Sequence, residues 1–365
     1  MKILHTESSM HWGGQEFRTL LEHNYLNSHG HTSWLACHPD SKLFLEAKAR
    51  GAKNIITLNL SRTWRLDIAV RIAFLCAIKK IDIINSHSGK DSALSILAYL
   101  MGKSLLRSRQ ITSPIKKNWS YKFSCSHILA AANAIKNILT DAGVNHQRIT
   151  VIGEGVDLQE FHPNVNFEYL KKEFNIQPNE KVIINIGMLR ADKGQMHFIE
   201  AAVSILKSRP DTKFFLIGGV TSTTSKQFEQ ELLKVIQKHH LEKQIIMTGY
   251  RNDIAEFICL SDLVVIASIG TEAQSRIVPQ SFACGKTVVT TNTGGLTELV
   301  FNEINGLVVP PKNAEAMSNA ILRLLDNQSL KHQLESAAYE LALEKLSFEK
   351  MIDKTIALYS RLTKN

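Results

Sequence analysis

A short apolar run followed by a polar loop decides the fold: Leu263-Val-Val-Ile-Ala267, and then Glu272-Ala-Gln-Ser-Arg276-Ile-Val-Pro279-Gln280. An unbroken apolar run of this length is typical of a strand that is buried on both faces of a parallel sheet. The loop after such a strand lies at the carboxyl edge of the sheet, where ligands bind in open α/β folds. Pro279 suits the first turn of a helix, whose free N–H groups attract phosphate.

Two polar side chains of this segment are suited to binding a sugar. The carboxylate of Glu272 can accept hydrogen bonds from sugar hydroxyls. The amide of Gln280 can both donate and accept, which suits a ribose. Taken alone, the pair also fits a surface glutamate and a helix-capping glutamine, so the interpretation depends on the neighbouring segments.

A second strand-to-helix junction lies upstream in the same half of the chain: Val182-Ile-Ile-Asn-Ile-Gly187-Met188-Leu-Arg190-Ala-Asp-Lys193-Gly194. An apolar strand leads into a basic loop, and a helix is expected after Gly194. Two cations beside a helix N-terminus can stabilise the charge that develops on a diphosphate leaving group. Arg190 offers a planar fork of donors, and Lys193 offers a point charge.

Together the two segments resemble the donor-binding half of the family-4 retaining glycosyltransferases, which have the GT-B fold. The family pattern is G-R-L-x-x-x-K-G, later E-x7-E, and then G-G-x-x-E after a small-residue turn. The matching positions in this chain are Gly187, Lys193, Gly194, Glu272, Gly285, Gly294, Gly295 and Glu298. The resemblance extends over nearly the whole chain, but it is specific only in residues 182–194 and 263–298.

Two positions depart from the family pattern. Met188 stands where the family usually places a phosphate-binding arginine, and Gln280 replaces the second glutamate. We expect Arg190, two residues further on, to take over the cationic role. The second glutamate of the family usually holds the nucleotide ribose, and Gln280 can keep that hydrogen bond. Two alternatives stay open: a catalytically degenerate nucleotide-sugar-binding subunit, and a GT-B-like non-hydrolysing epimerase.

The resemblance implies a retaining, metal-independent hexosyl- or heptosyltransferase. Its substrates would be a nucleotide-diphosphate sugar and a saccharide or lipid-linked saccharide acceptor, in lipopolysaccharide or cell-surface glycan synthesis. The implied catalytic residues are His87, Glu272, Lys193 and Arg190. The implied donor-binding residues are Gly13, Gly14, Gly187, Gln280, Gly294, Gly295 and Glu298. No cofactor other than the nucleotide-sugar substrate is implied, and no metal.

The first half contributes two of these predictions. His87 follows the apolar strand at 82–85, and family members commonly keep a histidine in this loop, near the donor sugar, although a lone histidine is also common in structural roles. It would orient or polarise the sugar and need not act as a base. Gly13-Gly14 resembles the first glycine-rich loop of the family, which faces the donor diphosphate and the acceptor.

The length of 365 residues favours two domains, because one hydrophobic core rarely serves so long a chain. We expect strands near 2–6, 33–37, 54–58, 82–85, 109–112, 127–131, 148–152, 181–187, 213–217, 244–247, 263–267, 287–290 and 306–309. Helical patterns separate most of them, which indicates an α/β fold of two Rossmann-like parallel-sheet domains facing each other across a cleft. The expected domains are 1–165 for the acceptor and 166–346 for the donor, with a terminal helix over 347–365 crossing back to the first.

The basic charge is concentrated in the first half. Residues 1–165 hold 20 Lys and Arg against 12 Asp and Glu, whereas residues 166–365 hold 23 against 22. This excess favours an anionic membrane surface as a partner. Of two basic segments, 62–80 is interpreted as an ordinary core helix. The segment 114–123 is the predicted membrane or acceptor surface, through Lys116, Lys117, Trp119 and Lys122. Because no nucleic-acid-binding signature accompanies the charge, we expect no nucleic-acid partner.

The remaining sequence features exclude several classes of protein. Five scattered cysteines without a C-x-x-C spacing indicate reduced, buried thiols and no zinc site. The sequence contains no run of eighteen apolar residues and no signal peptide. We therefore expect a cytoplasmic protein that is peripheral at the inner face of the cell membrane.

Overall fold

The computed structural model describes residues 1–115, 119–220, 223–270 and 272–364. It divides into two compact units. Unit 1 comprises Met1–Gly153 and the chain from Met351 onward, and unit 2 comprises Glu154–Lys350. The chain enters unit 2 before the expected boundary between 165 and 166, because Val156 and Phe161 already pack in the core of that unit.

Unit 1 contains a seven-stranded sheet in the order β3-β2-β1-β4-β5-β6-β7. Its strands are β1 (Lys2–Glu7), β2 (Thr32–Cys37), β3 (Ile55–Thr57), β4 (Ile83–Ser86), β5 (Ser104–Arg109), β6 (His127–Ala130) and β7 (Ile149–Val151), and every pairing is parallel. Its helices are α1 (Gly14–Ser28), α2 (Lys42–Ala49), α3 (Leu66–Ile78), α4 (Gly89–Leu94), α5 (Ile96–Leu100), α6 (Trp119–Phe123), α7 (Asn133–Asp141) and most of α15 (Phe348–Thr363). The strand order reverses between β1 and β4, and in open α/β sheets ligands bind beyond the carboxyl ends of the strands at such a reversal.

Strand β5 corrects one expectation. The expected strand at 109–112 is wrong, because the strand is Ser104–Arg109 and the chain leaves the sheet after Arg109. Two arginines hid it, since charged residues are rare in a buried strand. Arg107 and Arg109 are nevertheless almost completely buried, and the guanidinium carbon of Arg107 lies 3.7 Å from the ring centroid of Tyr121. Contact with an aromatic ring thus replaces the apolar side chain that the pattern required.

Unit 2 contains a six-stranded sheet in the order β10-β9-β8-β11-β12-β13. Its strands are β8 (Lys181–Ile186), β9 (Thr212–Ile217), β10 (Ile245–Gly249), β11 (Leu263–Ile266), β12 (Val288–Thr291) and β13 (Gly306–Val309). Its helices are α8 (Glu168–Glu173), α9 (Gln195–Ser208), α10 (Thr223–Lys238), α11 (Ile254–Leu260), α12 (Ile277–Ala283), α13 (Ala314–Asp326) and α14 (Gln328–Lys345). Here the order reverses between β8 and β11, so a ligand is expected beyond the carboxyl ends of those two strands.

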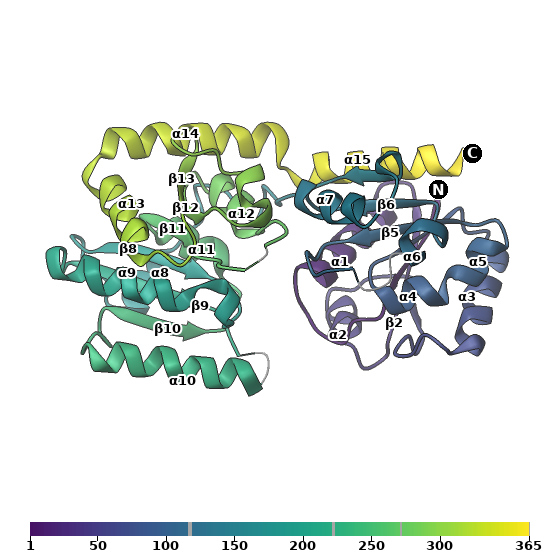
Figure 1. The fold of residues 1–365 in the computed structure, drawn as a ribbon, viewed down its shortest axis with the longest axis horizontal. Helices are drawn as coiled ribbons and strands as arrows, with labels where there is room; N and C mark the ends of the chain where they lie inside the picture. Colours follow the sequence, from purple (N-terminus) through teal and green to yellow (C-terminus); the bar gives the residue numbers. More distant parts are fainter. Residues whose placement is uncertain (116–118, 221–222, 271, 365) are drawn as a thin grey trace. The chain divides into compact units, whose positions relative to one another are not determined.

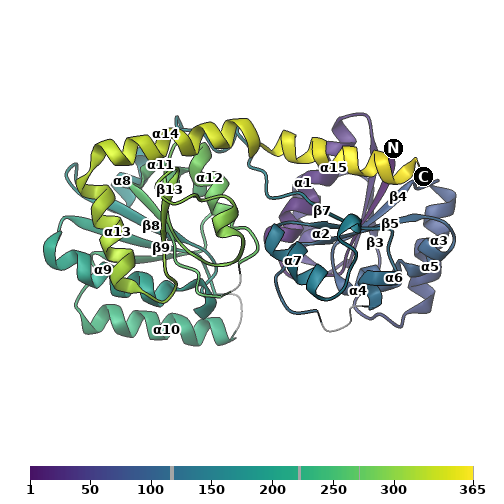
Figure 2. The same cartoon turned by 45° about the horizontal axis from the view of Figure 1, so that its top comes forward.

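Strand β11 shows why the apolar run is unbroken. Leu263 and Val265 pack in a cluster with α9, α10 and α13. Val264 and Ile266 point to the opposite face and pack with α8, α11, α12 and α14. Helices cover both faces of each sheet in the two views of Figure 1 and Figure 2. The α/β fold with two Rossmann-like parallel-sheet domains is therefore confirmed.

The terminal helix α15 packs in unit 1. Tyr359 is completely buried there, and the side-chain amide of Asn85 donates a hydrogen bond to its hydroxyl over 2.7 Å. All five cysteines are buried and unpaired, as the sequence indicated. Among the described residues, no helix combines the length and apolar character needed to cross a bilayer.

Candidate active site

The carboxyl ends of β8 and β11 bring Lys193 and Glu272 into contact. The Lys193 Nζ lies 2.6 Å from the Glu272 Oε2, and the Ser268 hydroxyl donates to the same oxygen over 2.9 Å. Among the described residues, none donates a hydrogen bond to the other carboxylate oxygen, Oε1. The Lys193 side chain is 25% exposed and the Glu272 side chain 13% exposed, so both are held in place while solvent still reaches them.

Two glycines allow these loops to touch. Gly194 has φ +71°, and a Cβ on it would lie 1.9 Å from the Ala267 carbonyl oxygen. Gly294 has φ +54°, and its Cβ would lie 1.9 Å from the Glu272 carbonyl oxygen. The Gly295 N–H donates to that same carbonyl over 2.9 Å. This amide, expected near the donor, therefore serves to position the backbone of Glu272.

Arg190 is turned toward a different partner. Its Nε and Nη2 lie 2.9 and 2.7 Å from the two carboxylate oxygens of Asp192, and the side chain is half exposed. The Asp192 carbonyl in turn accepts the N–H of Ile269 over 2.9 Å, which ties this loop to the one after β11. Arg190 is thus already paired with a carboxylate, and its cationic role toward a diphosphate stays a prediction.

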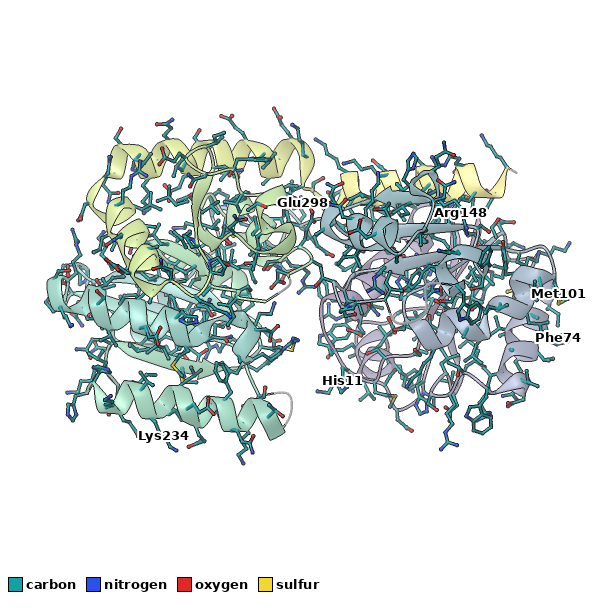
Figure 3. All side chains as sticks on the ribbon, in the orientation of Figure 1. His11, Phe74, Met101, Arg148, Lys234 and Glu298 are labelled. Atoms are coloured by element: carbon teal, nitrogen blue, oxygen red, sulfur yellow. The ribbon has the colours of Figure 1, made fainter. Side chains whose placement is uncertain are left out.

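The other predicted donor residues of unit 2 follow β8, β11 and β12 in the chain. The Gly187 N–H donates to the Ile217 carbonyl over 2.9 Å and so continues the pairing of β8 with β9. Gln280, on α12, is 9% exposed, and its Oε1 has no hydrogen-bond partner among the described residues. A buried acceptor without a partner is costly, and a ribose hydroxyl can supply the missing donor. Glu298 ends the 3-10 helix Gly294–Glu298 and is labelled in Figure 3.

In unit 1, His87 lies directly beyond β4, at the reversal of strand order. Its backbone N–H donates to the Thr6 carbonyl and to the Asp91 Oδ2, and its ring Nε2 lies 2.9 Å from the His5 Nδ1. Burial, followed by the charge of Arg18, lowers the pKa of His87 to about 3. The imidazole is therefore neutral at physiological pH, which suits hydrogen bonding and excludes a role as a cation.

Glu7, which the sequence did not single out, connects the two predicted loops of unit 1. Its Oε1 accepts the Ser9 N–H over 2.8 Å and the Ser88 hydroxyl over 2.6 Å. Its Oε2 accepts the Gln15 side-chain amide over 2.6 Å. Burial and the neighbouring charge of Asp91 raise the pKa of Glu7 to about 8. The glycine-rich loop and the His87 loop are thus held by one carboxylate.

Asp91 is the second buried carboxylate of this cluster. It accepts the hydroxyls of Thr6 and Ser8, each over 3.0 Å, and the N–H of His87. Burial raises its pKa to about 6. A charged residue at the end of a buried strand, as Glu7 is on β1, was the available signal for this cluster. Gly13 precedes α1 and Gly14 begins it, so the glycine-rich turn lies in the chain between Ser9 and Gln15, both of which donate to Glu7.

The predicted membrane surface is only partly described. Lys116 and Lys117 lie outside the described residues. Trp119 is 54% exposed, as expected, but Lys122 is half-buried and Tyr121 packs against Arg107. The helix predicted in 62–80 is α3, which packs one side in the core of unit 1 and also exposes large apolar side chains on the other.

A buried histidine near this cluster provides a pH prediction. His23 hydrogen-bonds with Ser33 and the Lys53 carbonyl, and burial lowers its pKa to about 4. The unfolded chain therefore binds a proton between about pH 6.5 and 4 that the native protein does not, so acid removes stability. The His23→Gln variant has no titrating group at this position, so it does not lose stability in acid for this reason. We expect the stability advantage of the wild type over the variant, from urea unfolding, to shrink by about 2 kcal/mol from pH 7 to pH 5. An equal difference at both pH values contradicts the assignment.

Comparison with known proteins agrees with this architecture. The family model "Glycosyltransferase Family 4" matches residues 12–160, and "Glycosyl transferases group 1" matches residues 166–341. A glycosyltransferase structure from Rickettsia africae has a TM-score of 0.92 and 25% identity, and the match covers 100% of this chain and 99% of that one.

Two of the curated relatives have names that include a diphosphoundecaprenol-linked sugar. The UDP-Gal:alpha-D-GlcNAc-diphosphoundecaprenol alpha-1,3-galactosyltransferase of Escherichia coli is 23% identical, over 84% of this chain and 82% of that protein. The N,N'-diacetylbacillosaminyl-diphospho-undecaprenol alpha-1,3-N-acetylgalactosaminyltransferase of Campylobacter jejuni is 30% identical, over 67% of this chain. The matched region spans 63% of the Campylobacter protein.

Proposed function

The chain belongs to the group 1 glycosyl transferases of family 4, and we propose that it transfers a sugar from a nucleotide-diphosphate donor with retention and without a metal. The observation that carries the donor assignment is the contact between Lys193 and Glu272, 2.6 Å apart beyond β8 and β11. A cation and a carboxylate side by side suit the two ends of a sugar diphosphate. Lys193 would bind the phosphate, and the open oxygen of Glu272 would accept sugar hydroxyls.

The proposed reaction breaks the bond between the anomeric carbon and the diphosphate oxygen. Negative charge then builds on the leaving diphosphate, and Lys193 stabilises it electrostatically. The acceptor oxygen attacks on the same face of the sugar, and its proton passes to the leaving phosphate. This route needs no separate protein base, and His87, whose pKa burial lowers to about 3, would be a weak one. Gln280 would hold the ribose through its unpaired Oε1.

For the acceptor we propose a saccharide or lipid-linked saccharide of lipopolysaccharide or another cell-surface glycan. The names of both curated relatives contain a diphosphoundecaprenol-linked sugar, which supports a lipid-linked acceptor. The transferred sugar would be a hexose or a heptose. The enzyme would work as a peripheral protein at the cytoplasmic face of the membrane, where nucleotide sugars and lipid-linked acceptors meet.

The donor assignment predicts thermal stabilisation by one nucleotide sugar. UDP-, GDP-, ADP- and CMP-sugars are screened in turn, and we expect one of the first three classes, which carry a diphosphate, to raise the Tm by several degrees. A ligand at about 100 times its Kd stabilises the native state by about 2.7 kcal/mol. Glu272→Ala should keep the shift caused by the free nucleotide and lose the additional shift caused by the sugar. Glu303→Ala, which removes an exposed carboxylate elsewhere in unit 2, is the control. No stabilisation by any of the four classes contradicts the proposal.

A degenerate nucleotide-sugar-binding subunit is the second candidate. Met188, Gln280 and the engagement of Arg190 by Asp192 favour it. Both candidates predict the thermal shift, but only an enzyme turns the donor over. Release of nucleotide from the stabilising donor by the wild type, abolished by Glu272→Ala, excludes the subunit. An epimerase is excluded when the donor sugar keeps its configuration in the absence of an acceptor.

A further inference from the structure

Helix α3 exposes a regular stripe of large apolar side chains. Ile68, Ile72 and Cys76 point into unit 1 and are completely or almost completely buried. On the opposite side, exposure is 79% at Leu66, 56% at Val70, 63% at Phe74 and 58% at Ile78. A spacing of four residues places these side chains on one face, along about 18 Å of helix.

Neighbouring residues extend this stripe. Helix α5 packs beside α3, and the chain at its end exposes Leu100 to 75% and Met101 to 62%. Trp64, just before α3, is 67% exposed. Figure 3 labels Phe74 and Met101, whose side chains point away from the body of unit 1. We call the seven residues the α3–α5 surface: Trp64, Leu66, Val70, Phe74, Ile78, Leu100 and Met101.

An apolar area of this kind indicates a binding surface. Single exposed apolar residues are normal, but a contiguous group usually marks an interaction site. Within unit 2, the described large apolar side chains with comparable exposure, such as Tyr250 and Ile304, are single residues in separate connections between strands and helices. The α3–α5 surface therefore differs from the described surface of unit 2.

The charges around the α3–α5 surface are almost all positive. Arg62, Arg71, Lys79 and Lys80 are exposed at its edge. The only acidic residue of the segment 62–80 is Asp67, and its carboxylate oxygens lie 2.7 and 2.6 Å from the guanidinium nitrogens of Arg65. An apolar centre with a basic edge is typical of helices that lie in the headgroup region of anionic membranes.

We infer that the α3–α5 surface docks unit 1 onto an anionic lipid bilayer, with α3 lying parallel to the membrane plane. A second copy of the chain is the competing occupant. A symmetric pair would place the same basic side chains opposite each other, with the Asp67 carboxylate already held by Arg65, and like charges across an interface are unfavourable. The docking itself does not depend on the proposed function. Only its purpose, which is to bring a lipid-linked acceptor within reach of the enzyme, rests on that function.

The test is sedimentation of the full chain with lipid vesicles. Wild-type protein is expected to bind vesicles of phosphatidylglycerol mixed with phosphatidylcholine, and to bind pure phosphatidylcholine weakly. Leu66→Ser with Phe74→Ser should lower the affinity for the anionic vesicles at least tenfold. Arg71→Gln with Lys79→Gln should lower it as well and reduce its dependence on salt. Leu45→Ser with Ile304→Ser is the matched control, since these side chains are 59% and 60% exposed elsewhere, and its affinity should equal that of the wild type.

Each result decides the inference. Equal vesicle binding by the wild type and the Leu66/Phe74 variant overturns it, and so does the absence of vesicle binding by the wild type. A wild-type dimer that the Leu66/Phe74 variant dissociates, without vesicle binding, assigns the surface to a second copy instead. Nucleotide release from the donor is measured in parallel and should be unchanged in every surface variant. Vesicle binding without donor turnover contradicts the proposed function but still supports the docking surface.

Discussion

Lys193→Ala is expected to lower kcat for sugar transfer by about 10²- to 10³-fold, the effect of removing one donor that stabilises a developing negative charge. The expectation follows from the position of Lys193 before α9, where its ammonium group contacts the Glu272 carboxylate. Loss of the ammonium group leaves the departing diphosphate without its cation. The rate of nucleotide release, followed in end-point and continuous assays, measures this turnover.

The fold should change much less than the rate. The pair is partly exposed, so its loss should cost about 1 to 2 kcal/mol, less than the 3 to 5 kcal/mol of a fully buried pair. Lys181→Ala is the matched control, because Lys181 also pairs with a carboxylate in unit 2, that of Asp262, but at the opposite end of β8. It should leave kcat within about twofold of the wild type, since it removes nothing that charge stabilisation requires. Wild-type turnover by Lys193→Ala excludes the role that we propose for this residue.

The sequence predicted the donor half of the molecule well because its signals are local. An apolar strand, a loop and a helix follow each other directly, and parallel strands place successive loops at one edge of the sheet. This is why Lys193 and Glu272, far apart in the chain, could be expected to meet, as they do. Their roles toward a donor, and those of Arg190 and Gln280, are still predictions, since they concern a ligand.

Other features were hidden because they depend on packing. Helix α3 is apolar on all sides, so periodicity alone cannot tell which side faces the core. Glu7 ends β1, and only the fold shows that Ser9, Gln15 and Ser88 all donate to its carboxylate. Strand β5 was misplaced for the same reason, since the ring that covers Arg107 comes from a separate helix. Long-range partners of polar side chains leave no local signal.

Gly294→Ala is expected to disable the enzyme and destabilise unit 2 more than any ordinary glycine substitution. Its added Cβ would lie 1.9 Å from the Glu272 carbonyl oxygen and 2.9 Å from the Glu272 nitrogen, both of which are backbone atoms. The φ of +54° is an additional strain for alanine. The left-handed conformation costs about 1 to 2 kcal/mol, and the overlap should add about 1 to 3 kcal/mol.

Gly249→Ala separates these two contributions. Gly249 also has a positive φ, +71°, but a Cβ there would meet nothing within 4 Å. It should therefore lose only the 1 to 2 kcal/mol or so of the left-handed conformation and keep its turnover. Gly294→Ala should lose more stability in urea unfolding and reduce kcat/KM by about 10²-fold or more in the protein that remains folded, because a shift of about 1 Å in a positioning group has that effect. Equal losses in the two variants mean that the backbone of Glu272 does not depend on the close approach of Gly294.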